Sequence, residues 1–461
     1  MKIRILLLLF FLVAIIIIWG ILRSGRKQPN ILLITLDTTR LDHLSCYGYK
    51  RKTSPNLDRL AEEGQRFENA IAVSSWTLPA HASLFTGLFP ATHGARYSEE
   101  GEISLNAAIP DLGEEIYGWF LTNRLPEEAL TLAEALRAAG YATGGIGAGP
   151  WLEPIFGLAQ GFDFYDSDIR SVAGRRADRV NALAVPFIRK NADRPFFLFL
   201  NYFDPHAPFE PPPAFTFKFF PENKTKDMAD DPVLAEAFAI ARYDAEIFYM
   251  DMQIGLIFDE LKNLGLYKDT CIIVMGDHGE HFGEHGLSGH GYSLFEKAVR
   301  APLIIKWPGG WKALSSNKEM CQQVDIMPTI LQRLGVELPR TLEGAPLGEV
   351  SHPVVCELYK SAGNIKKKGD RFDRHLKALY DGRYKLIRSS KQEDPDAGLF
   401  DLSVDPDEKE DLSKVKPGLA ESLQSQLEQW ERTLQAPLPA GPVESIDRKT
   451  EEQLKALGYA D

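Results

Sequence analysis

The sequence predicts an α/β sandwich, with a mostly parallel central sheet flanked by helices, and a small C-terminal subdomain with an antiparallel sheet. Apolar, β-branched runs of strand length alternate with longer amphipathic stretches through most of the 461 residues. Several runs are apolar at every position, as in parallel strands that helices cover on both faces. Beyond about Val350 the runs alternate between apolar and polar residues, which indicates half-exposed antiparallel strands.

The expected elements follow one another along the chain. Asn30–Leu36 reads NILLITL and is the first buried strand. Further buried strands are expected at 142–146, 196–202, 271–275 and 302–306, and helices at 56–64, 130–140 and 232–264. In the C-terminal part, 378–387 (ALYDGRYKLI) alternates like one half-exposed strand, 399–406 runs into a turn, and a helix is expected over about 419–434.

The N-terminus carries an unbroken apolar run at residues 5–22, with basic residues on both flanks. As a helix it would be about 27 Å long at a rise of about 1.5 Å per residue, close to the hydrocarbon thickness of a bilayer. No small-x-small cleavage site follows the run, so an uncleaved signal anchor is favoured over a cleaved signal peptide. We therefore expect a single-pass membrane protein.

Composition argues against several classes of protein. The net charge of −12 and the lack of a long basic block argue against nucleic acid as a partner. Lys366 to Lys368 form the only compact basic run, and a solvated loop is its expected interpretation. The four cysteines are scattered and form no CxxC pair, which indicates neither a zinc ribbon nor a disulfide scaffold.

Four segments carry side chains suited to chemistry. Asp37 directly follows the first strand, Thr77 opens the segment TLPAHASLFTG, and His206 lies between prolines after the strand at 196–202. The fourth is a glycine-rich span from Gly276, which contains Asp277, His278, His281, His285 and His290. An isolated acid at a strand end more often caps a helix, and a lone histidine is more often structural. Ligands of open α/β sheets nevertheless bind beyond the carboxyl ends of strands, so Asp37, Asp277 and His278 mark an expected metal site.

In this order, the segments make the chain similar to the sulfatase family within the alkaline phosphatase-like superfamily. The similarity runs from Pro29 to about Leu434 and includes Asp-His-Gly-Glu at 277–280 and Arg-Ala-Pro-Leu-Ile at 300–304. It implies an alkaline phosphatase-like sandwich whose catalytic domain lies on the periplasmic or extracellular side of the membrane. We expect a signal anchor and linker at 1–28, a sulfatase-like catalytic domain at 29–350, a C-terminal subdomain at 351–435 and a tail at 436–461.

The active-site signature of sulfatases begins with Cys or Ser, which is converted to formylglycine, and has an Arg four residues later. Here Thr77 and His81 occupy these positions, and threonine is not a known substrate for that conversion. The Lys that the family carries after Gly-x-x-Thr is also missing. The resemblance therefore favours phosphoester over sulfate chemistry, and the site is similar to the Thr-nucleophile branch that includes phosphoethanolamine transferases and lipoteichoic acid synthases.

The resemblance implies one divalent metal ion, held by Asp37, Thr77, Asp277 and His278. Sulfatases commonly have two successive acids after the first strand, whereas Thr38 fills the second position here. The loss of a charged oxygen and the gain of an imidazole nitrogen favour Zn²⁺ or Mn²⁺, with Ca²⁺ as the alternative.

The expected mechanism starts with attack of the Thr77 hydroxyl on sulfur or phosphorus. The family's arrangement assigns His206 and His290 to binding the anionic oxygens or protonating the leaving group. His81 would steady the nucleophile or carry a proton, and Arg300 would either neutralise charge or form a structural salt bridge.

Three functions fit these residues. The favoured one is a membrane-anchored, metal-dependent hydrolase of sulfate- or phosphate-type esters in a small molecule, a glycan or a lipid. The first alternative is a phospho-headgroup transferase acting on lipid or glycan, although the better-known transferases of that kind have several membrane helices. The second is a catalytically silent binding protein, against which the intact metal-type ligands argue.

Overall fold

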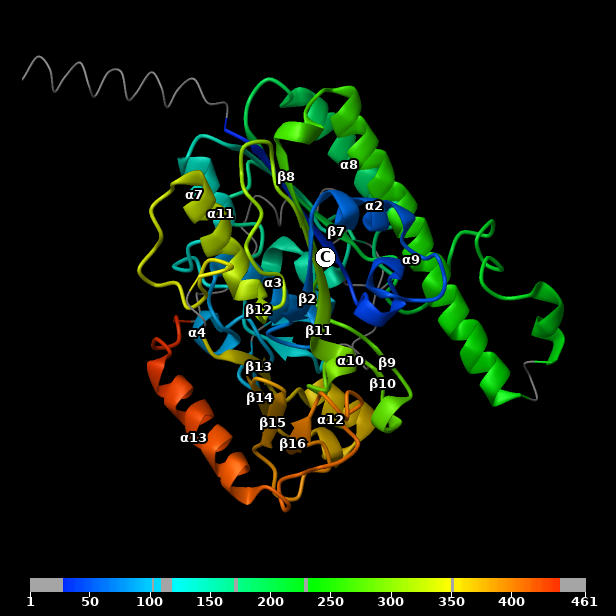
Figure 1. The fold of residues 1–461 in the computed structure, drawn as a ribbon, viewed down its shortest axis with the longest axis vertical. Helices are drawn as coiled ribbons and strands as arrows, with labels where there is room; N and C mark the ends of the chain where they lie inside the picture. The colour runs from blue at the N-terminus through cyan, green and yellow to red at the C-terminus, as the bar shows by residue number, and fades with distance from the viewer. Residues whose placement is uncertain are drawn as a thin grey trace, which may run out of the picture.

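The structure is a computed structural model that describes residues 28–101, 103–108, 118–169, 173–227, 231–349 and 352–439. Its centre is an eight-stranded sheet in the order β12-β2-β11-β8-β1-β7-β5-β6 (Figure 1). The strands are β1 (Asn30–Leu36), β2 (Gln65–Ile71), β5 (Ala142–Ile146), β6 (Phe164–Asp166), β7 (Phe196–Tyr202), β8 (Thr270–Gly276), β11 (Arg300–Lys306) and β12 (Cys321–Gln322). Only β11 runs antiparallel to its neighbours β2 and β8, which confirms the mostly parallel sheet.

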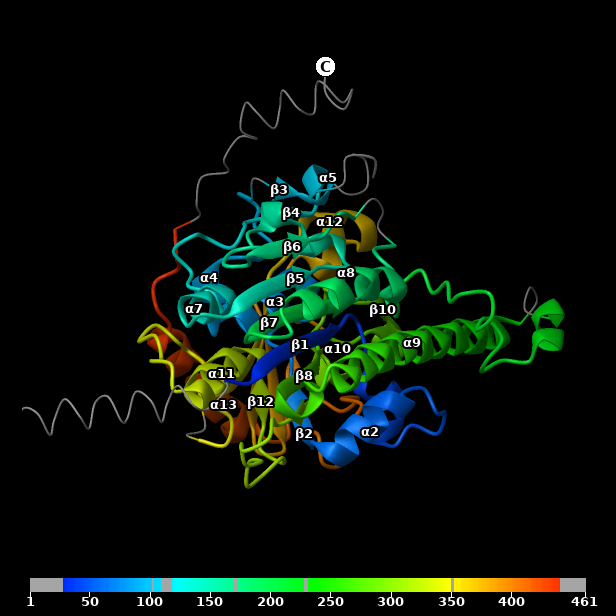
Figure 2. The ribbon, with the colours of Figure 1, turned by 90° about the horizontal axis from the view of Figure 1, so that it is seen from above.

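Helices cover both faces of this sheet (Figure 2). The helices α2 (Pro55–Glu63), α8 (Ala177–Lys190) and α9 (Pro232–Asn263) lie on one face, and α3 (Thr77–Thr86), α7 (Leu132–Ala138) and α11 (Ile326–Leu334) lie on the other. Successive side chains of β1 point to opposite faces of the sheet. Leu32 and Ile34 pack against the first group of helices, and Ile31 and Leu33 pack against the second. All four side chains are fully buried, as the unbroken apolar run predicts.

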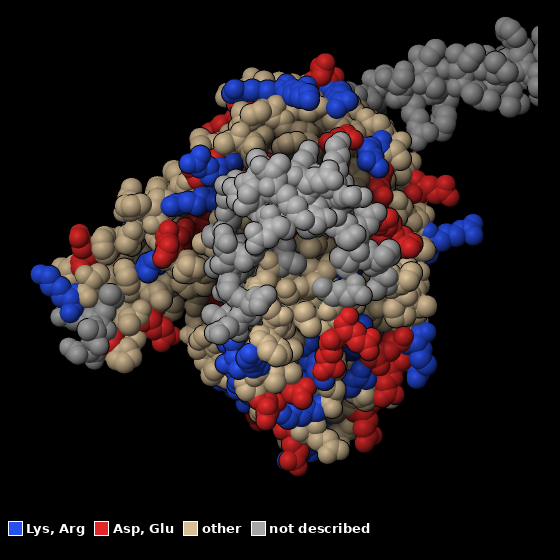
Figure 3. Space-filling model, turned by 180° about the vertical axis from the view of Figure 1, so that it is seen from behind, with Lys and Arg blue, Asp and Glu red and all other residues tan. Residues whose placement is uncertain are grey.

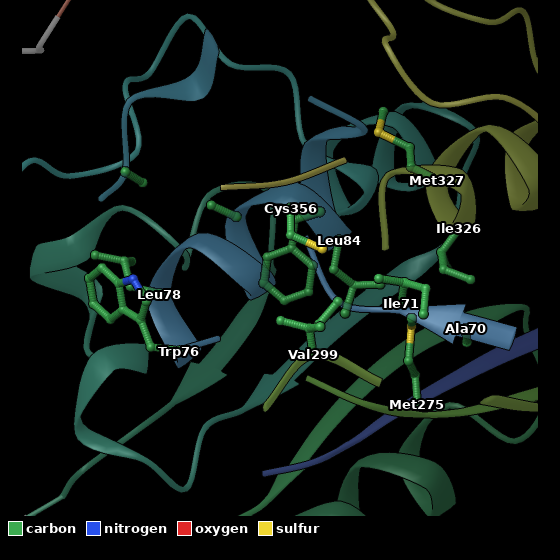
Figure 4. Close-up of a cluster of buried hydrophobic side chains, with 14 of the residues drawn as sticks. Ala70, Ile71, Trp76, Leu78, Leu84, Met275, Val299, Ile326, Met327 and Cys356 are labelled. Carbon is green, nitrogen blue, oxygen red and sulfur yellow. The ribbon is translucent and has the colours of Figure 1, made fainter. Parts of the chain in front are cut away.

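Packing fixes α3 on the sheet. Figure 4 shows Leu84 of α3 close to Ile71 of β2 and Val299, with Met275 of β8 beneath them. These side chains are all buried. Burial of each such side chain contributes about 1.5–3 kcal/mol, so the first residue of α3 has a well-defined position relative to the strand ends.

The C-terminal part is a four-stranded antiparallel sheet, as expected. Its strands are β13 (Val354–Leu358), β14 (Leu376–Asp381), β15 (Tyr384–Ser389) and β16 (Gly398–Asp401). The single strand expected over 378–387 is instead a hairpin, because Gly382 has a φ of +58° and turns the chain between β14 and β15. The helix α13 (Pro417–Thr433) covers the sheet with Leu423, Leu427 and Trp430.

Shorter elements connect these layers. They are α4 (Pro90–His93), α5 (Leu105–Ala108), α10 (Glu296–Val299), α12 (Ala362–Lys368), the strand pair β3 (Ile103–Ser104) and β4 (Leu121–Thr122), and the pair β9 (His281–Phe282) and β10 (Ser288–Gly289). On the face shown in Figure 3, Lys and Arg side chains lie among Asp and Glu side chains.

The expected single-pass membrane protein requires correction. Across the described ranges, no helix is long and apolar enough to cross a membrane. The apolar run at 5–22, on which the transmembrane and signal-anchor prediction rested, lies outside those ranges, as do residues 440–461 of the expected tail. The structure therefore does not support a single-pass membrane protein.

Candidate metal centre and active site

Two carboxylates meet at the carboxyl ends of adjacent strands. β1 and β8 pair in parallel with Leu36 opposite Gly276, so Asp37 and Asp277 leave the sheet side by side. Both side chains are buried, and so is that of His278. Ligand atoms of Asp37, Asp277 and His278 lie within 4.8 Å of one another, and no other such group occurs in the described part of the chain.

Hydrogen bonds hold the ligand atoms in place. Oδ1 of Asp277 accepts from the backbone N–H groups of Thr38 at 3.1 Å and His278 at 2.8 Å. Nδ1 of His278 donates to the carbonyl of Gly279 at 2.9 Å. Since a carbonyl only accepts, this bond leaves the lone pair on Nε2, which lies 3.3 Å from Oδ2 of Asp277.

A third strand orients the other carboxylate. Asn201 of β7 places Nδ2 3.5 Å from Oδ2 of Asp37, at the limit of a hydrogen bond. The same Nδ2 donates to the Thr35 hydroxyl at 3.1 Å, while Oδ1 accepts from two backbone N–H groups after β5. The amide orientation of Asn201 is thereby determined by its neighbours, and Asp37 is held between β8 and β7.

The residues fit a divalent cation. Oδ1 of Asp37, Oδ2 of Asp277 and Oγ1 of Thr38 are buried, and no hydrogen-bond partner for them lies among the described residues. Burial raises the pKa of Asp37 well above its usual value, with the charge of Asp277 adding to the effect, and burial raises the pKa of Asp277 to about 7. A bound cation would satisfy the unpaired oxygens and stabilise both ionised carboxylates.

Thr77 is the first residue of α3 and is buried beside this centre. Its hydroxyl lies 3.4 Å from Nε2 of His278. Because Nδ1 of His278 already donates to Gly279, the hydroxyl can donate to Nε2 in this arrangement. The amino-terminal end of a helix also stabilises negative charge, which favours a Thr77 alkoxide at this position.

His81 lies one helical turn behind Thr77 and is fully buried. Nδ1 donates to the Thr77 carbonyl at 2.8 Å, and Nε2 lies 2.9 Å from the Thr35 hydroxyl. Burial lowers the pKa of His81 to about 4, so the ring is neutral near pH 7 and accepts from Thr35. Nδ1 is also 3.8 Å from Oδ2 of Asp277. These contacts suit a residue that positions the start of α3.

His206 and His290 flank the centre with ring centroids 5.0 Å apart, and His290 lies 4.6 Å from His278 by the same measure. Nδ1 of His206 donates to the Ala207 carbonyl at 2.7 Å, and burial, with the charge of His290, lowers its pKa to about 4. Burial also lowers the pKa of His290, but the Glu280 carboxylate 3.2 Å from its Nδ1 outweighs this, and the net shift is upward. One neutral and one more readily protonated imidazole therefore lie side by side.

Three other residues from the sequence analysis contact groups outside this centre. Arg300 donates through Nη2 to the Glu68 carbonyl and to Asn69, both at 3.0 Å, which favours its structural alternative. Nε2 of His281 is 2.6 Å from the Ser293 hydroxyl. The ring of His285 stacks on Phe295 with centroids 3.7 Å apart.

Sequence reasoning missed Thr35, Asn201 and Glu280 as members of the site. Asn201 is the one strongly polar residue in the run FFLFLNY, and a polar side chain at the carboxyl end of a buried strand is a usable signal. Glu280 lies within the Asp-His-Gly-Glu segment, but its contact with His290 depends on how the loop after β8 folds back.

Comparisons with known proteins identify the family that the chain resembles. The sequence pattern of the family described as “Sulfatase” matches residues 29–336, and that described as “N-sulphoglucosamine sulphohydrolase, C-terminal” matches residues 283–435. An N-acetylglucosamine-6-O-sulfatase of Bacteroides thetaiotaomicron is 24% identical over 423 residues, with 71% of this chain and 72% of that one covered. A multifunctional alkaline phosphatase superfamily protein, PehA, of Trinickia caryophylli is 28% identical over 397 residues, with 69% and 76% covered.

Solved structures share the fold. The phosphonate monoester hydrolase of Agrobacterium radiobacter superimposes with a TM-score of 0.66 at 22% identity, covering 88% of this chain and 96% of that one. A protein in complex with its substrate D-glucosamine-2-N,6-O-disulfate gives a TM-score of 0.66 at 21% identity, covering 88% and 99%. The expected α/β architecture, with its C-terminal antiparallel sheet, is thereby confirmed.

Proposed function

The chain belongs to the sulfatase family, and from this premise we propose that Thr77 is the nucleophile of a metal-dependent ester hydrolase that prefers phosphoesters. Ester hydrolysis follows from family membership, and the nucleophile and the preference are the proposed part. One observation carries the proposal: the Thr77 hydroxyl lies at the start of α3, 3.4 Å from Nε2 of His278 and beside two buried carboxylates.

The proposed preference for phosphoesters rests on two residues, Thr77 and Thr38. A threonine occupies the place where sulfatases carry the Cys or Ser that becomes formylglycine, and a hydroxyl nucleophile forms a phosphate ester without prior conversion. Thr38 stands where sulfatases commonly have a second acid. The proposed ligand set is therefore the carboxylates of Asp37 and Asp277, the Thr77 hydroxyl and the His278 imidazole. We propose Zn²⁺ or Mn²⁺ as the ion. The similarity to a phosphonate monoester hydrolase is consistent with this chemistry.

Asp37, Thr77, Asp277 and His278 would hold the ion, which supplies Lewis-acid stabilisation of developing negative charge when bound. Thr77 releases its hydroxyl proton to solvent, its oxygen attacks phosphorus or sulfur, and the bond to the leaving alcohol breaks. His290, whose Nδ1 faces Glu280, has Nε2 available to protonate that alcohol. Water then cleaves the Thr77 ester and restores the hydroxyl.

Neighbouring groups support these steps without reacting. His206 donates its Nδ1 proton to the Ala207 carbonyl and burial keeps the ring neutral, so the lone pair on Nε2 can accept a proton from the attacking water. His81 holds the first turn of α3 through the Thr77 carbonyl. Each of these roles follows from which ring nitrogen already has a partner.

Turnover of three aryl esters tests the proposal. The full-length chain, supplied with Mn²⁺ or Zn²⁺, is assayed with an aryl sulfate, an aryl phosphate monoester and an aryl phosphodiester, beside Thr77→Ala, Thr77→Ser and Thr86→Ala. We expect phosphoester turnover that is lost in Thr77→Ala and retained in Thr77→Ser. Thr86 lies at the other end of α3, where its hydroxyl donates to the Ala82 carbonyl and accepts from the Leu88 N–H, so Thr86→Ala is the matched control.

Each other outcome has a clear meaning. Dominant aryl sulfate turnover would refute the phosphoester preference, and full activity of Thr77→Ala would refute the nucleophile. Transfer of a phospho-headgroup to an added acceptor alcohol, without hydrolysis, would identify a transferase instead. Bound metal without turnover of any ester would identify a silent binding protein.

A further inference from the structure

A cleft at the far end of the central sheet from the metal centre has no part in the proposed function. It has a volume of about 370 Å³ and lies between α8 and the strands β5 and β6, which are neighbours in Figure 2. We propose that this cleft binds a small amphipathic carboxylate, with an apolar body and a single anionic group. Its volume is near the lower end of the range for ligand pockets, about 300–1,000 Å³, so the ligand is small.

The sheet topology places the cleft away from the reacting centre. The cleft is lined by Ala142 and Phe164, the first residues of β5 and β6, and these strands run parallel to β7 and β1. It therefore lies at the amino ends of the strands, whereas Asp37 and Asp277 follow the carboxyl ends of β1 and β8. The seven residues of β1 span about 23 Å at about 3.3 Å per residue. A ligand in the cleft is thus separated from the reacting ester by roughly the length of a strand.

One face of α8 forms an apolar wall. Leu183, Pro186 and Phe187 line the cleft at spacings of three and four residues, which place them on the same side of the helix. Gly144 of β5 allows Phe187 to pack closely, since a Cβ there would lie 2.6 Å from its ring. The Phe187 ring is 26° from parallel to that of Phe164, with centroids 6.2 Å apart. Phe164 is 37% exposed, so part of its ring is open to the apolar body of a ligand.

Two cations lie beside this wall, at the C-terminal end of α8. Lys190 is one turn further along the same helix face, and Arg194 lies in the short connection between α8 and β7. Both side chains are exposed, and within the described ranges neither forms an ion pair with a carboxylate. Nε of Arg194 donates to Asn191 at 2.9 Å, which leaves its Nη groups for an external anion. A guanidinium matches the two oxygens of a carboxylate, so the geometry favours this anion.

The other charges near the cleft agree with an anionic ligand. Among the described residues that line it, Asp163 is the only carboxylate, and its Oδ2 accepts from the Thr143 N–H at 3.1 Å. Two cationic side chains therefore face one carboxylate that already has a partner. Arg189 is next to Lys190 in the sequence but pairs with Glu260 of α9 at 2.7 Å and does not line the cleft. It provides a matched control for the loss of a cation from α8.

Titration calorimetry with three eight-carbon probes tests the proposal. The full-length chain is titrated with octanoate, octanol and octylammonium, each below the concentration at which it forms micelles. We expect one octanoate to bind per chain, octanol to bind more weakly and octylammonium not to bind. The double variant Lys190→Gln/Arg194→Gln is expected to weaken octanoate binding about tenfold and to leave octanol binding unchanged. Arg189→Gln is expected to change neither.

A second variant tests the apolar part of the site. Leu183→Trp places a larger side chain in the cleft without changing its charge, so it is expected to weaken octanoate and octanol binding alike, with circular dichroism confirming the fold. Absence of octanoate binding to the wild type, or equal octanoate binding to the wild type and the double variant, would overturn the proposal. Wild-type dimers that Leu183→Trp dissociates in analytical ultracentrifugation would instead assign the cleft to a second copy of the chain.

Discussion

Replacing Lys385 with Met would break the buried ion cluster that holds the C-terminal sheet to α10. Lys385 of β15 is fully buried, and its Nζ lies 3.0 Å from Glu296 and 2.8 Å from Glu408. Burial lowers the pKa of Lys385, but the two carboxylates outweigh it and the net shift is upward, so the ammonium is charged. Its removal leaves two carboxylates facing each other in a dry site, at a cost of about 3–5 kcal/mol.

This cost translates into a measurable shift in Tm. For 461 residues, an entropy of unfolding near 2.1 cal/mol/K per residue gives about 1 kcal/mol/K, so Lys385→Met is expected to lower Tm by about 3–5 °C. Even in the intact cluster, burial raises the pKa of Glu408 to about 7. Without the ammonium one carboxylate takes up a proton more readily, so the loss is smaller at pH 5.5 than at pH 8.

Scanning calorimetry at several scan rates is the assay, because a chain of this size can unfold irreversibly. Lys409→Met is the matched control, since Lys409 pairs with Asp407 at the similar distance of 3.0 Å but its side chain is 75% exposed. An exposed pair contributes at most about 1 kcal/mol, so its Tm is expected to change by less than about 1 °C. Equal shifts in the two variants, or a Lys385→Met shift independent of pH, would refute the reasoning.

Three further substitutions probe the site and its surroundings. Asp277→Ala is expected to reduce bound divalent metal well below one ion per chain and to abolish ester turnover, and full metal content by emission spectroscopy would contradict the assigned ligand. Thr35→Val removes the hydroxyl that contacts His81, and kcat/KM is expected to fall about 10–100-fold with metal retained; unchanged kinetics would show that His81 needs no such support. Burial lowers the pKa of His352, but the 2.6 Å bond to Asp325 outweighs it and the net shift is upward. The protonated His352–Asp325 pair therefore stabilises the fold below the unfolded-state pKa of His352, and this stabilisation is lost as pH rises through the folded-state pKa. Urea unfolding of His352→Gln should show a larger loss of unfolding free energy at pH 6 than at pH 9. An equal loss at both pH values would contradict the assigned pair.

Local patterns predicted the centre of the sheet well and its periphery poorly. β1, β7 and β8 are apolar at nearly every position and were expected, whereas β2 (QRFENAI) carries polar residues at its half-buried positions and gave no clear signal. The helix α3 was also not expected, because every residue from Thr77 to Thr86 is buried and no polar face marks the helical period.

The same distinction holds at the site. Asp37 and Asp277 could be placed because each directly follows a recognisable strand. The contact between Thr35 and Asn201 depends instead on the register between β1 and β7, in which these two residues lie opposite each other. Register is set by the whole sheet rather than by neighbouring residues, so the support of His81 could not be anticipated from the sequence.

The parallel pairing of β1 with β8 also determines when the metal centre can form during synthesis of the chain. A ribosome must deliver the chain as far as Gly276 before Leu36 gains its neighbour and Asp37 meets Asp277. Until then the edge of β1 that later pairs with β8 has no partner strand, and an unpaired apolar edge is prone to association with other chains. The chain therefore cannot bind a metal ion through Asp37 and Asp277 until β8 has joined β1.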